Sequence, residues 1–220
     1  YEPIGIDDYY ALHGIFASTE TPKELPVIGE PPQNQEAKAF AKKMAELKQS
    51  LLDHERGIYN RAIREAVLHS PDYLVEVARP SEKKDGRLPR MQDGYEMTPI
   101  ILGRLKRLLR DKSPTHAILG PWVQLSKVPD DSFASDADKI LKQCIESIPN
   151  LNTCVEQELI SARPHSLNDL ASAYGRLIAR VVSNENDEAK SLIRDSKDLH
   201  SLWLVFGKAG TPFVVLENEW

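Results

Sequence analysis

The clearest pattern in the chain is a stripe of apolar residues that begins near residue 35. The stripe residues recur at alternating steps of four and three: Phe40, Met44, Leu47, Leu51 and, after a gap filled by His54, Ile58. Charged residues fill most of the positions between them. This spacing is close to the 3.5-residue period of a coiled coil and predicts an amphipathic helix from Gln35 to about His69. Such a helix would be on the order of 50 Å long.

Shorter apolar stripes, separated by prolines, predict further helices. Ser70-Pro71 and Thr98-Pro99 each place a capping hydroxyl residue before a proline that suits the first helical turn. The expected short helices cover residues 9–16, 73–79, 99–112, a segment around Trp122, 132–148, 155–160, 167–181 and 192–206, where Gly207 would be the C′ residue. We expect Asp130 or Asp131 to cap the helix that follows them, and Ser166 with Asp169 to form a variant capping box.

These elements predict an all-α fold, an irregular helical bundle with a long helical hairpin and Pro-rich extended ends. The hairpin would consist of the long helix and the segment 73–79 packed back on it. We expect three parts: residues 1–34, which include a Pro-rich linker; a helical module over residues 35–207; and an extended exit segment over residues 208–220.

Composition narrows the class of protein without naming a function. The 220 residues are 41% apolar and 28% charged, which is typical of a globular protein, and the net charge of −5 gives no electrostatic reason to bind nucleic acid. No apolar run approaches the roughly 18 residues of a membrane span. The opening residues resemble no signal peptide and include no starting Met, so we expect the natural chain to begin earlier.

The two cysteines, Cys144 and Cys154, leave two interpretations open. Their spacing fits neither a Cys-x-x-Cys metal site nor a haem attachment motif. They are either buried thiols on neighbouring helices or one disulfide formed in an oxidising compartment. Because Pro149-Asn150 separates the two helices, we expect the helices to pair antiparallel, with both thiols near one seam.

No arrangement of residues in the sequence indicates a catalytic or metal site. The six histidines show no ligand spacing, and no nucleophile motif is present. Arg104, Lys106, Arg107 and Arg110 gather on one expected helix and could bind an anionic polymer or glycan. Equally, they could be the solvated face of an amphipathic helix.

Several short motifs resemble one family along nearly the whole chain. They are Tyr1-Glu2-Pro3-Ile4, Asp8-Tyr9-Tyr10-Ala11-Leu12, Gly14-Ile15-Phe16-Ala17-Ser18-Thr19, Leu25-Pro26-Val27-Ile28-Gly29-Glu30-Pro31, Gly120-Pro121-Trp122, Ser166-Leu167 through Ala173-Tyr174-Gly175, and Phe206-Gly207 with Thr211-Pro212. Together they resemble the helical region between the two planctomycete-specific domains of unknown function in exported proteins with a cytochrome-c-like domain. The family's Cys-x-x-Cys-His run is absent here and would lie upstream of Tyr1.

The resemblance implies a periplasmic, cell-surface or secreted location, and it implies no reaction. Residues 1–34 would then be the tail of an upstream domain, and 208–220 would lead to a downstream one. We expect a non-catalytic structural or interaction module without a cofactor of its own, whose partners are neighbouring domains and other surface proteins. The alternative is part of a haem-c electron-transfer protein or enzyme, in which Tyr10 and His13 would face an upstream haem.

Overall fold

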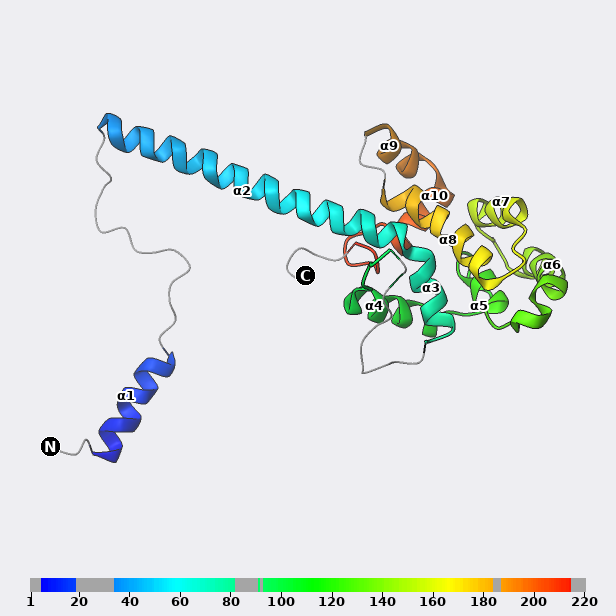
Figure 1. Cartoon of the computed structure of the whole chain (residues 1–220), viewed down its shortest axis with the longest axis horizontal. Helices are drawn as coiled ribbons and strands as arrows, with labels where there is room; N and C mark the ends of the chain where they lie inside the picture. Colours follow the sequence, from blue (N-terminus) through cyan, green and yellow to red (C-terminus); the bar gives the residue numbers. More distant parts are fainter. Residues whose placement is uncertain (1–4, 19–33, 82–90, 92, 184–186, 215–220) are drawn as a thin grey trace. The chain divides into compact units, whose positions relative to one another are not determined.

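The structure, a computed structural model, describes every residue except 1–4, 19–33, 82–90, 92, 184–186 and 215–220. Over the described residues the chain has ten helices and no strands, which confirms the all-α prediction (Figure 1). The helices are α1 (Ile6–Ser18), α2 (Gln35–Leu68), α3 (Ser70–Ala78), α4 (Pro99–Arg110), α5 (Gly120–Leu125), α6 (Asp130–Ser147), α7 (Thr153–Ala162), α8 (Leu167–Val182), α9 (Asp187–Asp195) and α10 (Lys197–Phe206). None of these helices combines the length and the apolar content of a membrane-spanning segment.

The chain divides into two units, Tyr1–Leu52 and Asp53–Trp220, and the division falls within α2. The predicted long helix is therefore present, with 34 residues. In the first unit, no described residue is buried. All buried residues of the described chain lie from Ala66 onward, so the hydrophobic core belongs to the second unit.

Helix α8 organises the core of the second unit. Its apolar residues recur at steps of three and four, and Leu170, Tyr174, Leu177, Ile178 and Val181 are all buried. Helices α3, α7 and α10 pack against α8, and α5 contacts it more lightly (Figure 1). A helix covered on several sides is buried over most of its surface, which explains why two alanines and Gly175 of α8 are buried as well.

Tyr174 joins α8 to α5 by polar and aromatic contacts. Its hydroxyl donates to the carbonyl oxygen of Ile118 at 2.8 Å and accepts from the backbone N–H of Trp122 at 3.2 Å. The two rings meet edge to face, with centroids 5.4 Å apart. Burial raises the pKa of the Tyr174 phenol. The hydroxyl thus satisfies two backbone groups inside the core, where unpaired groups would be costly.

The expected long hairpin is not formed. Helix α3 packs against α8 and α4 instead of running back along α2. Gly175 makes this packing close, because a Cβ atom there would lie 2.7 Å from Cγ of Pro71. The sequence shows that residues 70–78 have an apolar face, but it does not say which helix that face meets.

Two predicted caps lie at the expected positions. Thr98 occupies the N-cap position of α4, followed by Pro99, although its side chain makes no capping hydrogen bond. The Ser166 side chain accepts from the N–H of Asp169 at 3.1 Å, and the Asp169 carboxylate accepts from the N–H of His165. Asn152 also caps α7, because its side chain accepts hydrogen bonds from the N–H groups of Cys154 and Val155.

Two other capping predictions were wrong. His69 occupies the N-cap position of α3, so Ser70 is already helical, and its hydroxyl is buried without a hydrogen-bond partner among the described residues. Pro129 precedes α6, and Asp130 and Asp131 lie in its first turn. In the first turn their negative charges interact favourably with the positive end of the helix dipole, but they do not cap the helix.

The single helix expected over residues 192–206 is two helices, α9 and α10. Ser196 separates them and caps α10 by accepting from the N–H of Leu199 at 3.3 Å. Gly207 is not a left-handed C′ residue, because its φ is −107°. A Cβ atom at Gly207 would lie 2.5 Å from the Trp203 ring and 2.8 Å from the Val181 carbonyl oxygen. Close approach of α8 and α10, and not a turn conformation, explains this glycine.

The exit segment also differs from its prediction in the part described, residues 208–214. It turns back on itself, with the N–H of Gly210 donating to the carbonyl oxygen of Val214 at 2.8 Å. Phe213 is fully buried, and its ring packs edge to face with the ring of Tyr73, with centroids 6.1 Å apart. Residues 215–220 and residues 19–33, which include the expected Pro-rich linker, lie outside the described residues.

Candidate functional site

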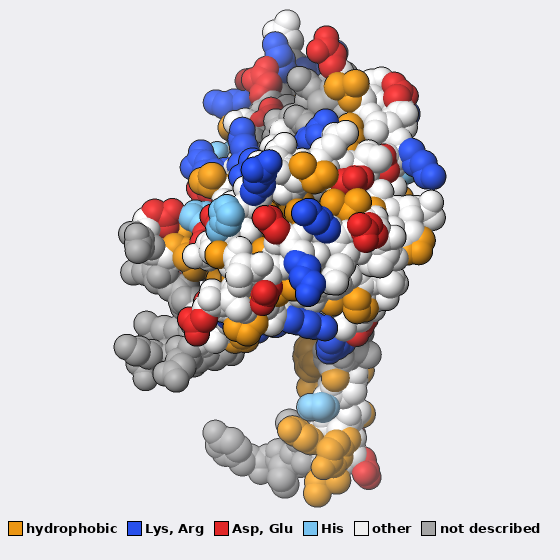
Figure 2. Space-filling view, turned by 90° about the vertical axis from the view of Figure 1, so that its right-hand side faces the viewer, with side chains coloured by type: hydrophobic (Ala, Val, Ile, Leu, Met, Phe, Trp, Pro, Cys, Tyr) orange, Lys and Arg blue, Asp and Glu red, His pale blue; other side chains and the backbone are white. Residues whose placement is uncertain are grey.

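The four basic residues predicted on one helix do not share one surface. Arg104 and Arg107 line a groove of about 540 Å³ beside residues 210–212, and Arg104 donates to the carbonyl oxygen of Thr211 at 3.3 Å. Lys106 and Arg110 line a different groove, of about 430 Å³, next to Trp122. The positive charge is therefore divided between two sides of α4. The face of the molecule in Figure 2 likewise shows side chains of both charges interspersed.

The residues proposed to face a haem lie on α1. Tyr10 and His13 are both exposed, and the ring of Tyr9 lies 5.5 Å from that of Tyr10 and 6.2 Å from that of His13. Across the described residues, no group of three or more His, Cys, Asp or Glu side chains is arranged to hold a metal ion. That Tyr10 and His13 face an upstream haem stays a prediction.

Cys144 and Cys154 are both free thiols. Their helices are not the expected antiparallel pair, because α6 packs chiefly on α5 whereas α7 packs on α8 and α10. Cys144 is fully buried, and burial raises the pKa of its thiol to about 11. Burial also raises the pKa of the half-buried Cys154 thiol. Neither residue is in an environment that activates a nucleophile.

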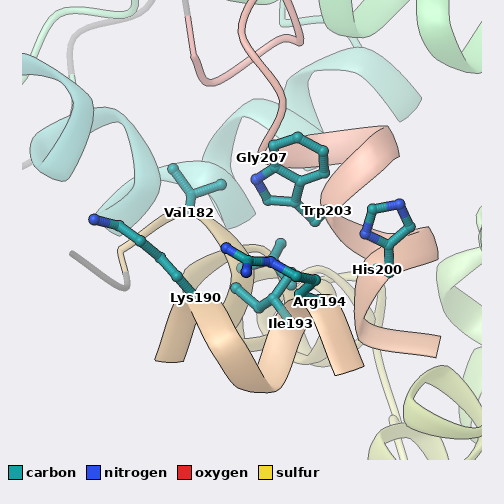
Figure 3. Close-up of a pocket in the computed structure, with 8 residues that line it drawn as sticks. Val182, Lys190, Ile193, Arg194, His200, Trp203 and Gly207 are labelled. Atoms are coloured by element: carbon teal, nitrogen blue, oxygen red, sulfur yellow. The ribbon is translucent and has the colours of Figure 1, made fainter. Parts of the chain in front are cut away.

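A pocket of about 420 Å³ lies between α8, α9 and α10 (Figure 3). Its apolar lining is Val181, Val182, Ile193 and Trp203, and its polar lining is Lys190, Arg194 and His200. In Figure 3, Arg194 and Trp203 face the same space from α9 and α10. The His200 ring stacks near Trp203, with centroids 5.7 Å apart.

The pocket pairs a broad aromatic surface with two cationic side chains, which suits a small anion with a flat apolar part. Sequence reasoning missed it because the region was expected to be one straight helix. The signal that could have shown it is Ser196, a capping residue that restarts the helix and so turns α10 back toward α9. Lys190 and Arg194, four residues apart, then lie on the same side of α9.

A second cluster that sequence reasoning missed surrounds His69. Its Nδ1 lies 3.0 Å from a carboxylate oxygen of Asp72, and its Nε2 lies 3.1 Å from one of Asp93. The His69 ring stacks on the ring of Tyr95, with centroids 4.1 Å apart, and the hydroxyl groups of Tyr95 and Tyr73 share a hydrogen bond of 2.9 Å. The cluster fastens the segment before α4 to the start of α3.

The first part of α2 carries an exposed apolar surface. We define the α2 stripe as Phe40, Met44, Leu47 and Leu51, whose exposed fractions are 68%, 39%, 57% and 57%. All four lie in the first unit. Monomeric proteins seldom expose an ordered row of large apolar side chains, and such rows are typical of binding surfaces.

We find no protein-family model that matches the chain, and no match among curated proteins or solved structures. The resemblance to the planctomycete proteins is therefore untested by these comparisons.

Proposed function

We propose that this chain is a non-catalytic helical interaction module, which binds another helix through the α2 stripe. The observation that carries the proposal is that all four stripe residues are exposed on a regular helix. Their spacing of four, three and four residues is the spacing by which two helices interlock side chains.

The energetics of α2 support a partner. Residues 35–52 of α2 have no buried residue, so this part of the helix gains no stability from a core. Isolated helices are marginal in water, and most helical stability in proteins comes from packing of an apolar face. A partner helix on the α2 stripe would supply that packing.

The proposal extends to the setting of the module. We propose that it belongs to a larger exported protein, at the cell surface or in the periplasm, where it orients neighbouring domains. The support is the resemblance to the planctomycete proteins. A haem-c protein with its reactive centre outside these residues is the corresponding alternative, and a haem spectrum of a longer natural chain would test it.

Photo-crosslinking tests the interaction module. A benzoylphenylalanine is placed at position 47 of the chain, in cells that produce the natural protein, and matched protein carries the same group at position 52. Leu52 is 55% exposed on the same helix but lies off the stripe. We expect position 47 to link to a polypeptide at least about fivefold more than position 52, since the stripe residue faces the partner.

The crosslinked product is identified by mass spectrometry. A link at position 47 to any polypeptide segment, including another part of the same protein, supports the module. Equal or absent linking at both positions would contradict it, because a bound stripe must shield one side of the helix.

Binding of a small anion in the pocket between α8, α9 and α10 is the second candidate function. The favouring observation is the pairing of Trp203 with Lys190 and Arg194 around one space. Naphthalene-1-sulfonate is a suitable probe, because it joins a flat ring to an anion. We expect Lys190→Gln and Arg194→Gln each to weaken its binding about tenfold, as for loss of a charge-assisted hydrogen bond.

Fluorescence titration of the probe gives the dissociation constants. Lys197→Gln is the matched control, since Lys197 is an exposed lysine at the start of α10 that does not line the pocket. Binding that is equally strong in all three variants would rule out this pocket as the site.

A further inference from the structure

We propose that the helix bound by the α2 stripe is α2 of a second copy of this chain, running antiparallel to the first. This inference rests on the proposed interaction module and names its partner.

The stripe is symmetrical in a way that fits an antiparallel partner. In one register all four residues find apolar partners: Phe40 lies opposite Leu51 of the second copy, and Met44 opposite its Leu47. The same two pairs form again on the other side of the two-fold axis, so each copy contributes four side chains. This isologous arrangement closes as a dimer and leaves no stripe residue exposed.

The charges beside the stripe disfavour the parallel alternative. With Met44 and Leu51 at heptad positions a, Lys43 is at position g and Lys48 at position e. In a parallel dimer, Lys43 of each copy would lie beside Lys48 of the other, which places like charges together twice. In the antiparallel register, Lys43 faces Ser50 of the second copy, and Lys48 faces its Ala41.

The two lysines are available for this discrimination. Lys43 and Lys48 are both exposed, while the neighbouring Lys42 pairs within its own helix with Glu46 at 3.9 Å. Like-charge contacts at these flanking positions are a known determinant of helix orientation and partner choice.

Helix α1 is a poorer occupant of the α2 stripe. Its large apolar residues are exposed too: Ile6, Tyr9, Tyr10, Leu12, Ile15 and Phe16. Tyr9, Leu12 and Phe16 recur at steps of three and four, but this row covers only residues 9–16, so it is shorter than the α2 stripe, which runs from residue 40 to residue 51. The α2 helix of a second copy presents a row of matching length and spacing by definition.

Sedimentation of the full 220-residue chain across the micromolar range gives the first test. We expect a monomer–dimer equilibrium in the natural sequence. Leu47→Gln should weaken the dimer at least about tenfold, because a polar group replaces an apolar one at the centre of the seam. Leu52→Gln is the matched control, with the same substitution on the same helix, and should leave the equilibrium unchanged.

Disulfide trapping gives the orientation. Tagged Met44→Cys chain is mixed with untagged Leu47→Cys chain under mild oxidation, with the natural chain as a control for Cys144 and Cys154. An antiparallel dimer brings position 44 of one copy to position 47 of the other, so the mixed disulfide should dominate. Homodisulfides of each variant alone would indicate the parallel arrangement and overturn the proposal.

A chain that stays monomeric at every concentration, or a dimer that loses affinity equally with Leu47→Gln and Leu52→Gln, would also overturn self-pairing. With either result, the proposal of an interaction module would still hold if position 47 crosslinks to another polypeptide or to α1. The module and its partner therefore fail by different measurements.

Discussion

Asn152 shows how a single residue can hold several parts of this fold in place. Its Oδ1 accepts from the N–H groups of Cys154 and Val155, at 3.1 and 3.2 Å, and so caps α7. Its Nδ2 donates to the carbonyl oxygen of Asp198 at 2.8 Å, at the start of α10. Its own N–H donates to the carbonyl oxygen of Ala117. The side chain is almost fully buried, so each lost hydrogen bond leaves a group away from water.

Asn152→Ala should therefore lower the free energy of unfolding by about 2–4 kcal/mol, which combines loss of the α7 cap with loss of the hydrogen bond to the Asp198 carbonyl oxygen. Urea denaturation followed by circular dichroism measures it. Asn168→Ala is the matched control, because Asn168 is exposed in the first turn of α8, and should change the value by less than about 0.5 kcal/mol. Equal effects would show that Asn152 is not a structural link.

The two thiols should react slowly with iodoacetamide at neutral pH. Only the thiolate reacts, and burial raises the pKa of Cys144 from 9.0 to about 11 and that of Cys154 in the same direction. We expect Cys154, which is half-buried, to be modified first, and Cys144 only on unfolding. Mass spectrometry of a time course checks the order, and faster labelling of Cys144 would contradict its burial.

The raised pKa of the Cys144 thiol also makes the free energy of unfolding depend on pH. Between pH 9.0 and about 11 the unfolded chain loses the thiol proton while the folded chain keeps it. The contribution of this group to the free energy of unfolding is therefore present below pH 9 and falls as the pH rises through that window.

At the scale of elements, α3 packs closely on α8. The contact is close because Gly175 has no side chain: an added Cβ would lie 2.7 Å from Pro71 and 3.3 Å from the Ser70 hydroxyl oxygen. Both partners belong to the first turn of α3, which proline makes rigid. The buried hydroxyl of Ser70 has no hydrogen-bond partner in the described chain, and no feature of the structure explains why serine stands there.

Gly175→Ala should destabilise the protein by about 1–3 kcal/mol, because the added methyl group forces α3 and α8 apart. Gly103→Ala is the contrasting variant: Gly103 lies inside α4 with nothing within 4 Å of an added Cβ, so alanine should stabilise by up to about 1 kcal/mol. Thermal unfolding of both variants gives the comparison. No loss of stability in Gly175→Ala would refute the close contact.

At the scale of the whole molecule, the hydrophobic core and the α2 stripe belong to different units. Every buried residue of the described chain lies in Asp53–Trp220, whereas the α2 stripe lies in Tyr1–Leu52. The second unit has a core large enough to fold cooperatively, and the described part of the first unit has none. Folding and binding can therefore be altered separately by mutation.

Deletion of residues 1–52 should leave the midpoint of thermal unfolding within about 2 °C of that of the full chain, measured at a concentration where the chain is monomeric. Phe213→Ala is the comparison, since that ring is fully buried, and should cost about 3–5 kcal/mol. A large drop on deletion would show that the first unit contributes to the core.

Much of this architecture could be predicted from residue patterns. Ser166 marks a helix start because its side chain accepts a hydrogen bond from a backbone N–H three residues on, and Thr98 marks another because the proline after it suits the first helical turn. The basic residues of α4 show the limit of that reasoning. Arg104 and Lys106 project to opposite sides of the helix, because residues two apart are separated by about 200°, and the segments packed beside α4 decide which groove each side chain lines.

The sequence by itself determined the all-α class, the long α2 helix and its apolar stripe, because helical period and capping depend on residues within a few positions of one another. Only the tertiary structure decided that α3 packs on α8, that Ser196 separates two helices around a pocket, and that Phe213 returns to the core. Those outcomes depend on which apolar faces meet across long stretches of chain. A local pattern shows that a face is apolar, and the fit of side chains such as Gly175 and Pro71 selects its partner.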